Sequence, residues 1–229
     1  MRRTIFIICL IILVCNGLFA QKYKPVTVKA GTSIKENFPV SETYLYNEFT
    51  KGKGIFTEGR TISCLFNLNL LSGEMEFIQS NDTLIITKKK EIVSIIVAAD
   101  TFYYHGAYLQ QIQNGPLSVF VKRGLIIKNI LKQGAMGTIN RSSASESYNF
   151  ISINSRSIDL KSTDDMVLQK MDQYFYSTSR DEFIQLNKKN ILNTFPEKEN
   201  ELKDYIRTNK VRFDSREDLL KLAYYAGTL

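Results

Sequence analysis

Residues 69–87, NLLSGEMEFIQSNDTLIIT, decide the fold. Short apolar runs stand on either side of Ser72-Gly73, and another follows Asn81-Asp82. Glycine and asparagine tolerate the positive φ that tight chain reversals need. A loop that cradles phosphate would instead need several glycines leading into a helix, and neither turn has them. The stretch therefore predicts an antiparallel sheet that folds back on itself.

The same pattern of short apolar runs and turns extends over residues 51–187. In residues 61–68, TISCLFNL, a period of two collects the apolar side chains on one face of a strand. That face contains Ile62, Cys64, Phe66 and Leu68. We predict a mainly β domain with C-terminal helices (β+α), an antiparallel β meander that is rolled or half-barrel-like. Residues 133–147, rich in small polar side chains, predict a mobile loop within it.

The two ends of the domain differ from this pattern. Residues 21–50 are polar and predict an irregular N-terminal segment. Residues 188–229 change to helical spacing and predict a helical segment packed on the sheet. Ser215 begins the last helix and Gly227 is predicted to end it. The apolar stripe of the last helix is Leu219, Leu222 and Ala223, and that of the preceding helix is Leu202, Tyr205 and Ile206.

The first twenty residues predict a secretory signal peptide. Arg2 and Arg3 precede an apolar run, and Ala20 precedes the polar Gln21. The run is shorter than the roughly 18–20 residues that span a bilayer. The alternative is lipidation at Cys15, but a valine precedes this cysteine where a lipobox favours a small residue. We therefore expect export, a periplasmic or envelope-associated location in a Gram-negative bacterium, and no membrane span after cleavage.

Cysteine and charge content exclude several classes of protein. Cleavage after Ala20 leaves Cys64 as the one cysteine, so no intramolecular disulfide forms, and the strand pattern predicts a buried, unreactive thiol. The mature chain retains 28 Lys and Arg against 23 Asp and Glu. This moderate excess does not indicate nucleic-acid binding. The one basic run, residues 88–90, predicts a solvated turn or a guard of the sheet edge.

No arrangement of residues predicts catalysis, a cofactor or a metal site. The single histidine, His105, lies in a predicted turn near Asp100, but no nucleophile motif accompanies it. Glu74 and Glu76 have the i, i+2 spacing of one strand face, which predicts a solvated face more strongly than a glycosidase pair. One histidine and one mature cysteine are too few for a typical zinc site. We expect a protein that is not an enzyme.

Aromatic residues give the strongest indication of a binding surface. A candidate platform for a ligand or a partner consists of Tyr44, Tyr46, Phe102, Tyr103, Tyr104, His105 and Tyr108. Packing in the core and rim of the sheet is the alternative role of these rings. The partner classes considered are an envelope protein, a lipid and a glycan.

Two motifs carry a resemblance to a family. The stretches LNLLSGEMEF, residues 68–77, and KKNILNTFP, residues 188–196, resemble uncharacterised secreted β-rich proteins of Bacteroidota-type bacteria. The resemblance covers roughly residues 38–225. It implies export and a β-rich body with a helical end, and it supplies no catalytic residues.

The sequence as a whole leaves two hypotheses of function. The first is a non-catalytic secreted or periplasmic, envelope-associated binding or scaffold protein. The alternative is a carrier of a lipid or another apolar molecule in a cavity between sheet and helices. A filled core under the helices favours the first, and a continuous apolar cavity favours the second.

Overall fold

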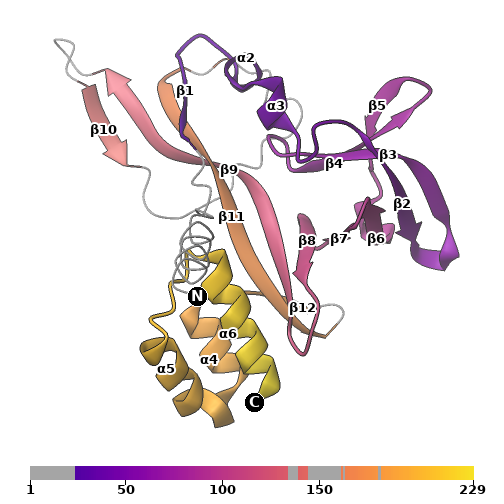
Figure 1. Ribbon diagram of the computed structural model, residues 1–229. Helices are drawn as coiled ribbons and strands as arrows, with labels where there is room; N and C mark the ends of the chain where they lie inside the picture. Colours follow the sequence, from indigo (N-terminus) through magenta and orange to yellow (C-terminus); the bar gives the residue numbers. More distant parts are fainter. Residues whose placement is uncertain (1–23, 134–138, 144–160, 162, 180–181) are drawn as a thin grey trace, which may run out of the picture.

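The computed structural model describes residues 24–133, 139–143, 161, 163–179 and 182–229. In this part of the chain, twelve strands form one antiparallel sheet in the order β1-β11-β9-β8-β7-β6-β2-β3-β4-β5, with β10 on β9 and β12 on β11 (Figure 1). The sheet is open. The predicted β+α class and antiparallel sheet are confirmed, while the signal segment and much of the predicted loop lie outside the described residues.

The strands vary from three to sixteen residues. They are β1 (Val26–Val28), β2 (Thr50–Phe56), β3 (Thr61–Asn69), β4 (Glu74–Gln79), β5 (Asp82–Ile85), β6 (Ile92–Val97), β7 (Asp100–Tyr104), β8 (Tyr108–Gln113), β9 (Ser118–Gln133), β10 (Ile139–Ser143), β11 (Asp165–Ser179) and β12 (Glu182–Gln185). The helices are α2 (Ile34–Asn37), α3 (Val40–Thr43), α4 (Lys188–Thr194), α5 (Glu199–Thr208) and α6 (Arg216–Thr228). Short 3-10 turns are η2 (Thr57–Gly59), η3 (Lys89–Glu91) and η5 (Pro196–Lys198).

Local side-chain chemistry forms the two turns that the sequence predicts. Between β3 and β4, the Asn69 side chain accepts hydrogen bonds from the backbone of Leu71 and Ser72, and Gly73 has a φ of 70°. Between β4 and β5, Ser80 and Asn81 both have positive φ, the geometry of a two-residue hairpin whose twist matches the strands. Both reversals are therefore specified locally.

One connection departs from a simple meander. Strand β6 does not continue beside β5 but pairs with β2, on the edge opposite β3. The intervening segment, residues 86–91, crosses from the outer edge of the sheet back to its middle. Ile86 at its start and Ile92, the first residue of β6, are buried in one core with Phe66 and Phe102. Burial of these two isoleucines holds the crossing segment against the sheet.

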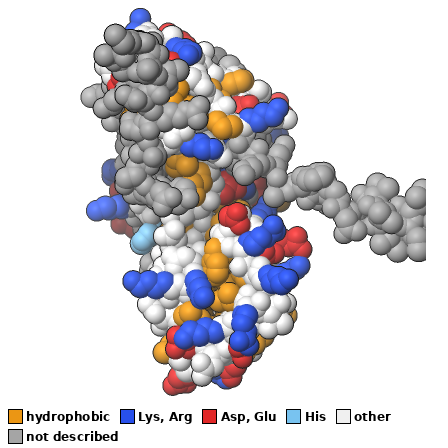
Figure 2. Space-filling model, turned by 90° about the vertical axis from the view of Figure 1, so that its left-hand side faces the viewer, with side chains coloured by type: hydrophobic (Ala, Val, Ile, Leu, Met, Phe, Trp, Pro, Cys, Tyr) orange, Lys and Arg blue, Asp and Glu red, His pale blue; other side chains and the backbone are white. Residues whose placement is uncertain are grey.

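The C-terminal helices pack on one end of the long antiparallel pair β9 and β11 (Figure 1). Asn187 and Ser215 cap α4 and α6 with their side chains. Both predicted apolar stripes face inward, and a shared core joins them to residues of the sheet. That core includes Leu117, Val119, Tyr176, Leu186, Leu202, Ile206, Leu219, Leu222 and Ala223. Over this end, Lys and Arg mix with Asp and Glu (Figure 2), so this face carries no patch of one sign.

Gly227 has a different role from the predicted one. It lies inside α6, which continues to Thr228, and does not end the helix. A Cβ at this position would lie 2.7 Å from the backbone nitrogen of Leu117 and 2.8 Å from Cβ of Pro116. The glycine therefore allows α6 to approach the β8–β9 turn closely.

The N-terminal segment is more regular than expected. It contains β1 on the edge of β11, and α2, which begins with a capping box between Ser33 and Glu36. Ile34 and Phe38 are buried against β9 and β11 residues in a third core. Asn67 of β3, only 1% exposed, exchanges hydrogen bonds with the backbone of Tyr46. No helix in the described part of the chain has the length and apolar character needed to cross a bilayer.

Candidate functional site

The aromatic residues expected to form one platform are divided among separate places. Phe102 and Tyr108 are 0% and 3% exposed, so they belong to the core and not to a surface. Tyr104 packs edge-on against Tyr108, with ring centroids 5.1 Å apart. Tyr44 and Tyr46 lie on the segment that precedes β2. Packing therefore accounts for most of the set.

Tyr44 and Tyr46 each use their hydroxyl to bind a carboxylate. The Tyr44 hydroxyl donates to Glu76 Oε2 at 2.7 Å, and the Tyr46 hydroxyl donates to Asp100 Oδ2 at 2.6 Å. Partial burial, followed by the hydrogen bond to the neighbouring carboxylate, raises the pKa of both phenols. These bonds fix the segment before β2 to the sheet, a structural role.

Tyr103 and His105 belong to a second aromatic cluster. Alternation along β7 points Tyr103 to the face opposite Phe102. Its ring meets Phe120 edge-on at 5.6 Å, and the His105 ring lies 5.4 Å from Phe183. Phe183 comes from β12, about eighty positions later in the chain, so the sequence could not place it there. His105 itself is exposed in the β7–β8 turn, as predicted (Figure 2, pale blue).

The carboxylates of β4 are not a solvated pair, and that expectation is wrong. Glu74 is 18% exposed and its Oε1 lies 2.5 Å from Lys89 Nζ. Glu76 accepts hydrogen bonds from Tyr44 and from Asn69 Nδ2. The turn after β3 and the crossing segment cover this end of the strand. The basic run is likewise not merely solvated, because Lys89 is tied to Glu74.

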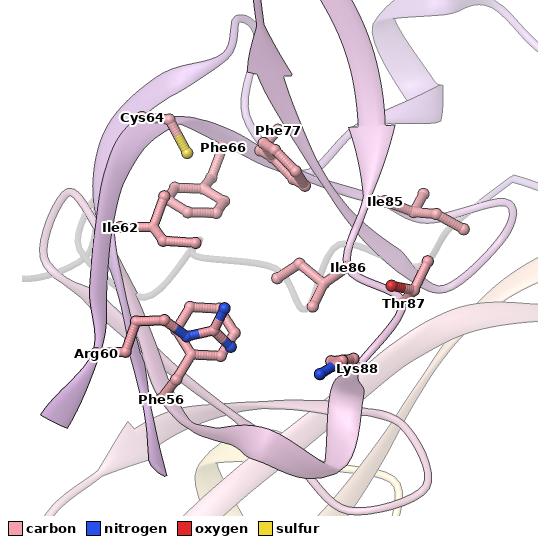
Figure 3. Close-up of a pocket in the computed structure, with 10 residues that line it drawn as sticks. All are labelled: Phe56, Arg60, Ile62, Cys64, Phe66, Phe77, Ile85, Ile86, Thr87 and Lys88. Carbon is pink, nitrogen blue, oxygen red and sulfur yellow. The ribbon is translucent and has the colours of Figure 1, made fainter. Parts of the chain in front are cut away.

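An apolar pocket of about 160 Å³ lies between β3 and the crossing segment (Figure 3). We call it the β3 pocket. The strand contributes Ile62, Cys64 and Phe66, and the other side of the pocket is the chain from Ile85 to Lys88. Phe56, Arg60 and Phe77 complete the lining. The pocket exists because β6 pairs with β2, which draws residues 86–91 across the sheet face.

The rim of the β3 pocket is positively charged. Arg60 lies over the Phe56 ring, 4.7 Å from its centroid, and its Nη2 is 2.8 Å from Glu91 Oε2. Lys88 Nζ is 3.1 Å from the other oxygen of the same carboxylate. Two cations, Arg60 and Lys88, therefore share one carboxylate at the mouth of an apolar recess.

The unpaired edge of the sheet leads into the same pocket. Strand β5 is the last strand on its side of the sheet, and all four of its residues are exposed. Leu84 and Ile85 are 40% and 38% exposed. Exposed apolar residues on an edge strand favour pairing with another extended chain. Ile85 ends the strand and lines the pocket, so the edge and the recess are continuous.

Cys64 shares a face with Ile62, Phe66 and Leu68 as predicted, but the burial expected for that face is incomplete. Phe66 and Leu68 are 1% and 3% exposed, whereas Ile62 is 38% exposed and Cys64 is half-buried in the pocket wall. The outer end of β3 opens onto the pocket because the crossing segment does not reach it. Burial raises the pKa of the Cys64 thiol.

We expect Cys64 to react with iodoacetamide in the folded protein, several-fold more slowly than in the unfolded chain. The open pocket admits the reagent, while the raised pKa lowers the fraction of reactive thiolate. Labelling followed by mass spectrometry, with and without guanidinium, measures both rates. Complete protection of Cys64 from the reagent in the folded state would agree with the fully buried thiol that the sequence predicts. It would contradict an open pocket.

The described residues contain no group of three or more His, Cys, Asp and Glu side chains arranged to hold a metal ion. Asp100, the acidic residue near His105 in sequence, binds the Tyr46 hydroxyl. The prediction of a chain that is not an enzyme stays a prediction.

The period-two pattern of β3 places three residues of the pocket on one strand face but does not predict the pocket. The apolar run Leu84-Ile85-Ile86 could have indicated it. Three apolar residues in a row do not fit the alternation of an edge strand, and lysines follow shortly after them. Comparison with protein-family models, curated proteins and solved structures finds no match. The resemblance to secreted Bacteroidota-type proteins therefore stays a prediction.

Proposed function

We propose that this chain is a non-catalytic, envelope-associated binding protein, and that it binds an extended segment of a partner protein along β5. The observation that carries the proposal is the continuity of the exposed β5 edge with the β3 pocket. Backbone groups of an added strand would pair with the edge. A side chain of that strand would enter the pocket. In strand addition, the backbone hydrogen bonds give affinity and the side-chain pockets give specificity.

The pocket volume limits what enters it. A cavity of about 150 Å³ lined by Leu, Ile and Phe holds one benzene molecule. The β3 pocket, at about 160 Å³, therefore suits one large apolar side chain such as Phe or Leu. Because Arg60 and Lys88 outnumber Glu91 at the mouth, we expect acidic residues beside that anchor.

The alternative carrier function has less support. Sites that enclose a whole small ligand usually measure about 300–1,000 Å³, well above the β3 pocket. The contact between sheet and helices is packed, since Val119, Tyr176, Leu202 and Leu222 are each 0% exposed. A filled contact of this kind favours a binding protein over a carrier with a cavity under the helices.

A random peptide library displayed on phage, selected on the mature chain, tests the proposal. We expect enriched peptides to contain Phe or Leu beside Asp or Glu, and synthetic copies to bind in fluorescence polarisation. Cys64→Phe, which fills the pocket from its own wall, should abolish binding. Ile96→Glu is the control, because Ile96 is 36% exposed and aligns through Lys53 with Ser63, on the face of the sheet opposite Cys64.

Two outcomes of the selection would overturn this proposal. One is enrichment of peptides that lack an apolar anchor. The other is binding of anchored peptides that Cys64→Phe leaves unchanged, because such peptides would dock elsewhere.

Export is a separate part of the proposal. We expect N-terminal sequencing of the protein purified from its own cells to begin at or near Gln21. The basic, apolar and small-residue order of the first twenty positions is the reason. A mature chain that begins at a lipidated Cys15 would contradict cleavage after Ala20 and place the protein on a membrane as a lipoprotein.

A further inference from the structure

One face of the sheet is exposed around β2, β3 and β6. The core side chains of these strands, such as Phe66 and Ile95, point to the opposite face, where the crossing segment lies. The C-terminal helices pack over the β9 and β11 end of the sheet and not over these strands (Figure 1). We call the exposed side the outer face. Its side chains on the three strands are Lys51, Lys53, Ile55, Thr61, Ser63, Leu65, Asn67, Ser94 and Ile96.

Strand register brings lysines and apolar side chains together on the outer face. Lys51 lies opposite Leu65 across β2 and β3, and Lys53 lies opposite Ile96 across β2 and β6. Leu65 and Ile96 are large aliphatic residues, yet they are 37% and 36% exposed. The next strand adds Ile78, which is half-buried beside Leu65. The outer face is therefore one continuous surface of cationic and aliphatic side chains.

The positive charge of the outer face is not neutralised by neighbouring carboxylates. None of its side chains on β2, β3 and β6 is acidic. Within the described part of the chain, neither Lys51 nor Lys53 forms an ion pair. Glu76, which follows on β4 on the same face, already accepts hydrogen bonds from Tyr44 and Asn69. The outer face therefore attracts an anionic partner.

The composition of the outer face favours a lipid surface over another protein. The cores of protein–protein interfaces are rich in Tyr, Trp and Arg and depleted of Lys, whereas the outer face of these strands holds only Lys, Ile, Leu, Ser, Thr and Asn. A lysine can lay its aliphatic stem along apolar surface and keep its ammonium group in a polar layer. A symmetric dimer through this face would bring lysines against lysines.

We propose that the outer face binds the surface of a membrane that contains anionic lipids. Lys51 and Lys53 lie at the level of the lipid phosphates. Leu65 and Ile96 enter the boundary between headgroups and acyl chains. The β3 pocket opens on the opposite face, so a molecule bound in this way presents the pocket to solvent. The inference rests on the proposed association with the envelope, for which it names the lipid surface, and it does not depend on peptide binding at β5.

Co-sedimentation of the mature chain with phospholipid vesicles tests the outer face. We expect binding to vesicles of phosphatidylethanolamine and phosphatidylglycerol but not of phosphatidylcholine alone, with release as salt rises from about 0.1 M to about 1 M. Lys51→Gln/Lys53→Gln should lower the partition coefficient about 25-fold, because one lysine near an anionic surface contributes about fivefold. Ile96→Glu should also lower it, because a carboxylate is repelled by the lipid phosphates.

Lys188→Gln/Lys189→Gln is the matched control, because it removes the same charge from two exposed lysines in the first turn of α4. Its partition coefficient should fall much less. Equal losses for the two double variants would overturn the proposal, because net charge alone would then explain binding.

A further comparison separates the outer face from the peptide site. Cys64→Phe should bind vesicles as the unchanged protein does, although it is expected to lose peptide binding. Peptide binding without any binding to anionic vesicles would overturn the lipid proposal and leave the proposed function standing. Binding of polyglutamate that depends on Lys51 and Lys53, without binding to vesicles, would overturn it as well and assign the outer face to an acidic protein.

Discussion

Truncation after Phe195 is expected to leave a chain that does not hold its native fold. The removed segment contributes Leu202, Leu219 and Leu222, all 0% exposed, to the core shared with the sheet. Burial of each large apolar side chain is worth about 1.5–3 kcal/mol, against a total stability of about 5–15 kcal/mol for a domain. The truncated chain would also expose Val119 and Tyr176 on the sheet. We expect aggregation or rapid digestion in limited proteolysis.

A single substitution in the same core measures how much the helices contribute to the stability of the protein without removing the segment. Leu222→Ala is expected to lower the free energy of unfolding by about 2–5 kcal/mol, because the residue is fully enclosed. Tyr224 on the same helix is 59% exposed, so Tyr224→Ala should change the free energy of unfolding by no more than about 0.5 kcal/mol. Urea unfolding followed by circular dichroism compares the two variants. A soluble truncated monomer with an unchanged melting temperature would show that the helices do not stabilise the sheet.

Local signals made the strands and hairpins predictable. The β3–β4 and β4–β5 turns depend on residues within the turns themselves, such as Asn69, Gly73 and Asn81. The stripes of α5 and α6 follow from helical spacing, and a short helix must bury such a stripe to be stable. These features were therefore recovered from the sequence, including which faces point inward.

The strand order could not be recovered in the same way. Whether β6 pairs with β5 or with β2 depends on contacts between residues about forty positions apart, such as Gly52 with Val97. A period-two pattern shows which side chains share one face of a strand. It does not show which strands pair with each other. The β3 pocket is a product of that choice, so it was missed. The candidate aromatic platform is divided because its members lie on different strands and on both faces of the sheet, and the alternative role of packing accounts for most of them.

The β3 pocket depends on the crossing segment, residues 86–91. Its start forms one side of the pocket, through Ile86 and Lys88. Lys89, the next residue, pairs with Glu74 of β4. The pocket wall and this ion pair are thus positioned by one short connection. Its location depends on how closely β6 can approach β2.

Gly52 permits that approach. A Cβ built on this residue would lie 2.5 Å from the backbone oxygen of Ile96, 2.8 Å from Cδ2 of Phe66 and 3.3 Å from Cα of Val97. Real Cβ atoms essentially never come within 3.0 Å of another atom in this way. Two of the three contacts are backbone atoms of β6, which cannot move without loss of strand pairing. Glycine inside a strand commonly marks such a close backbone approach.

Gly52→Ala is therefore expected to destabilise the protein by about 3 kcal/mol, the upper range for overpacking in a core. Gly115→Ala is the control, since a Cβ there meets no atom within 4 Å. Urea unfolding gives the difference in the free energy of unfolding. Because the displaced β6 would carry residues 86–91 with it, Gly52→Ala should also change the iodoacetamide reactivity of Cys64 in the folded state, whereas Gly115→Ala should not. Equal stability of the two variants would contradict a backbone contact at Gly52. A destabilised Gly52→Ala protein with unchanged Cys64 reactivity would mean that β6 and the crossing segment are positioned independently.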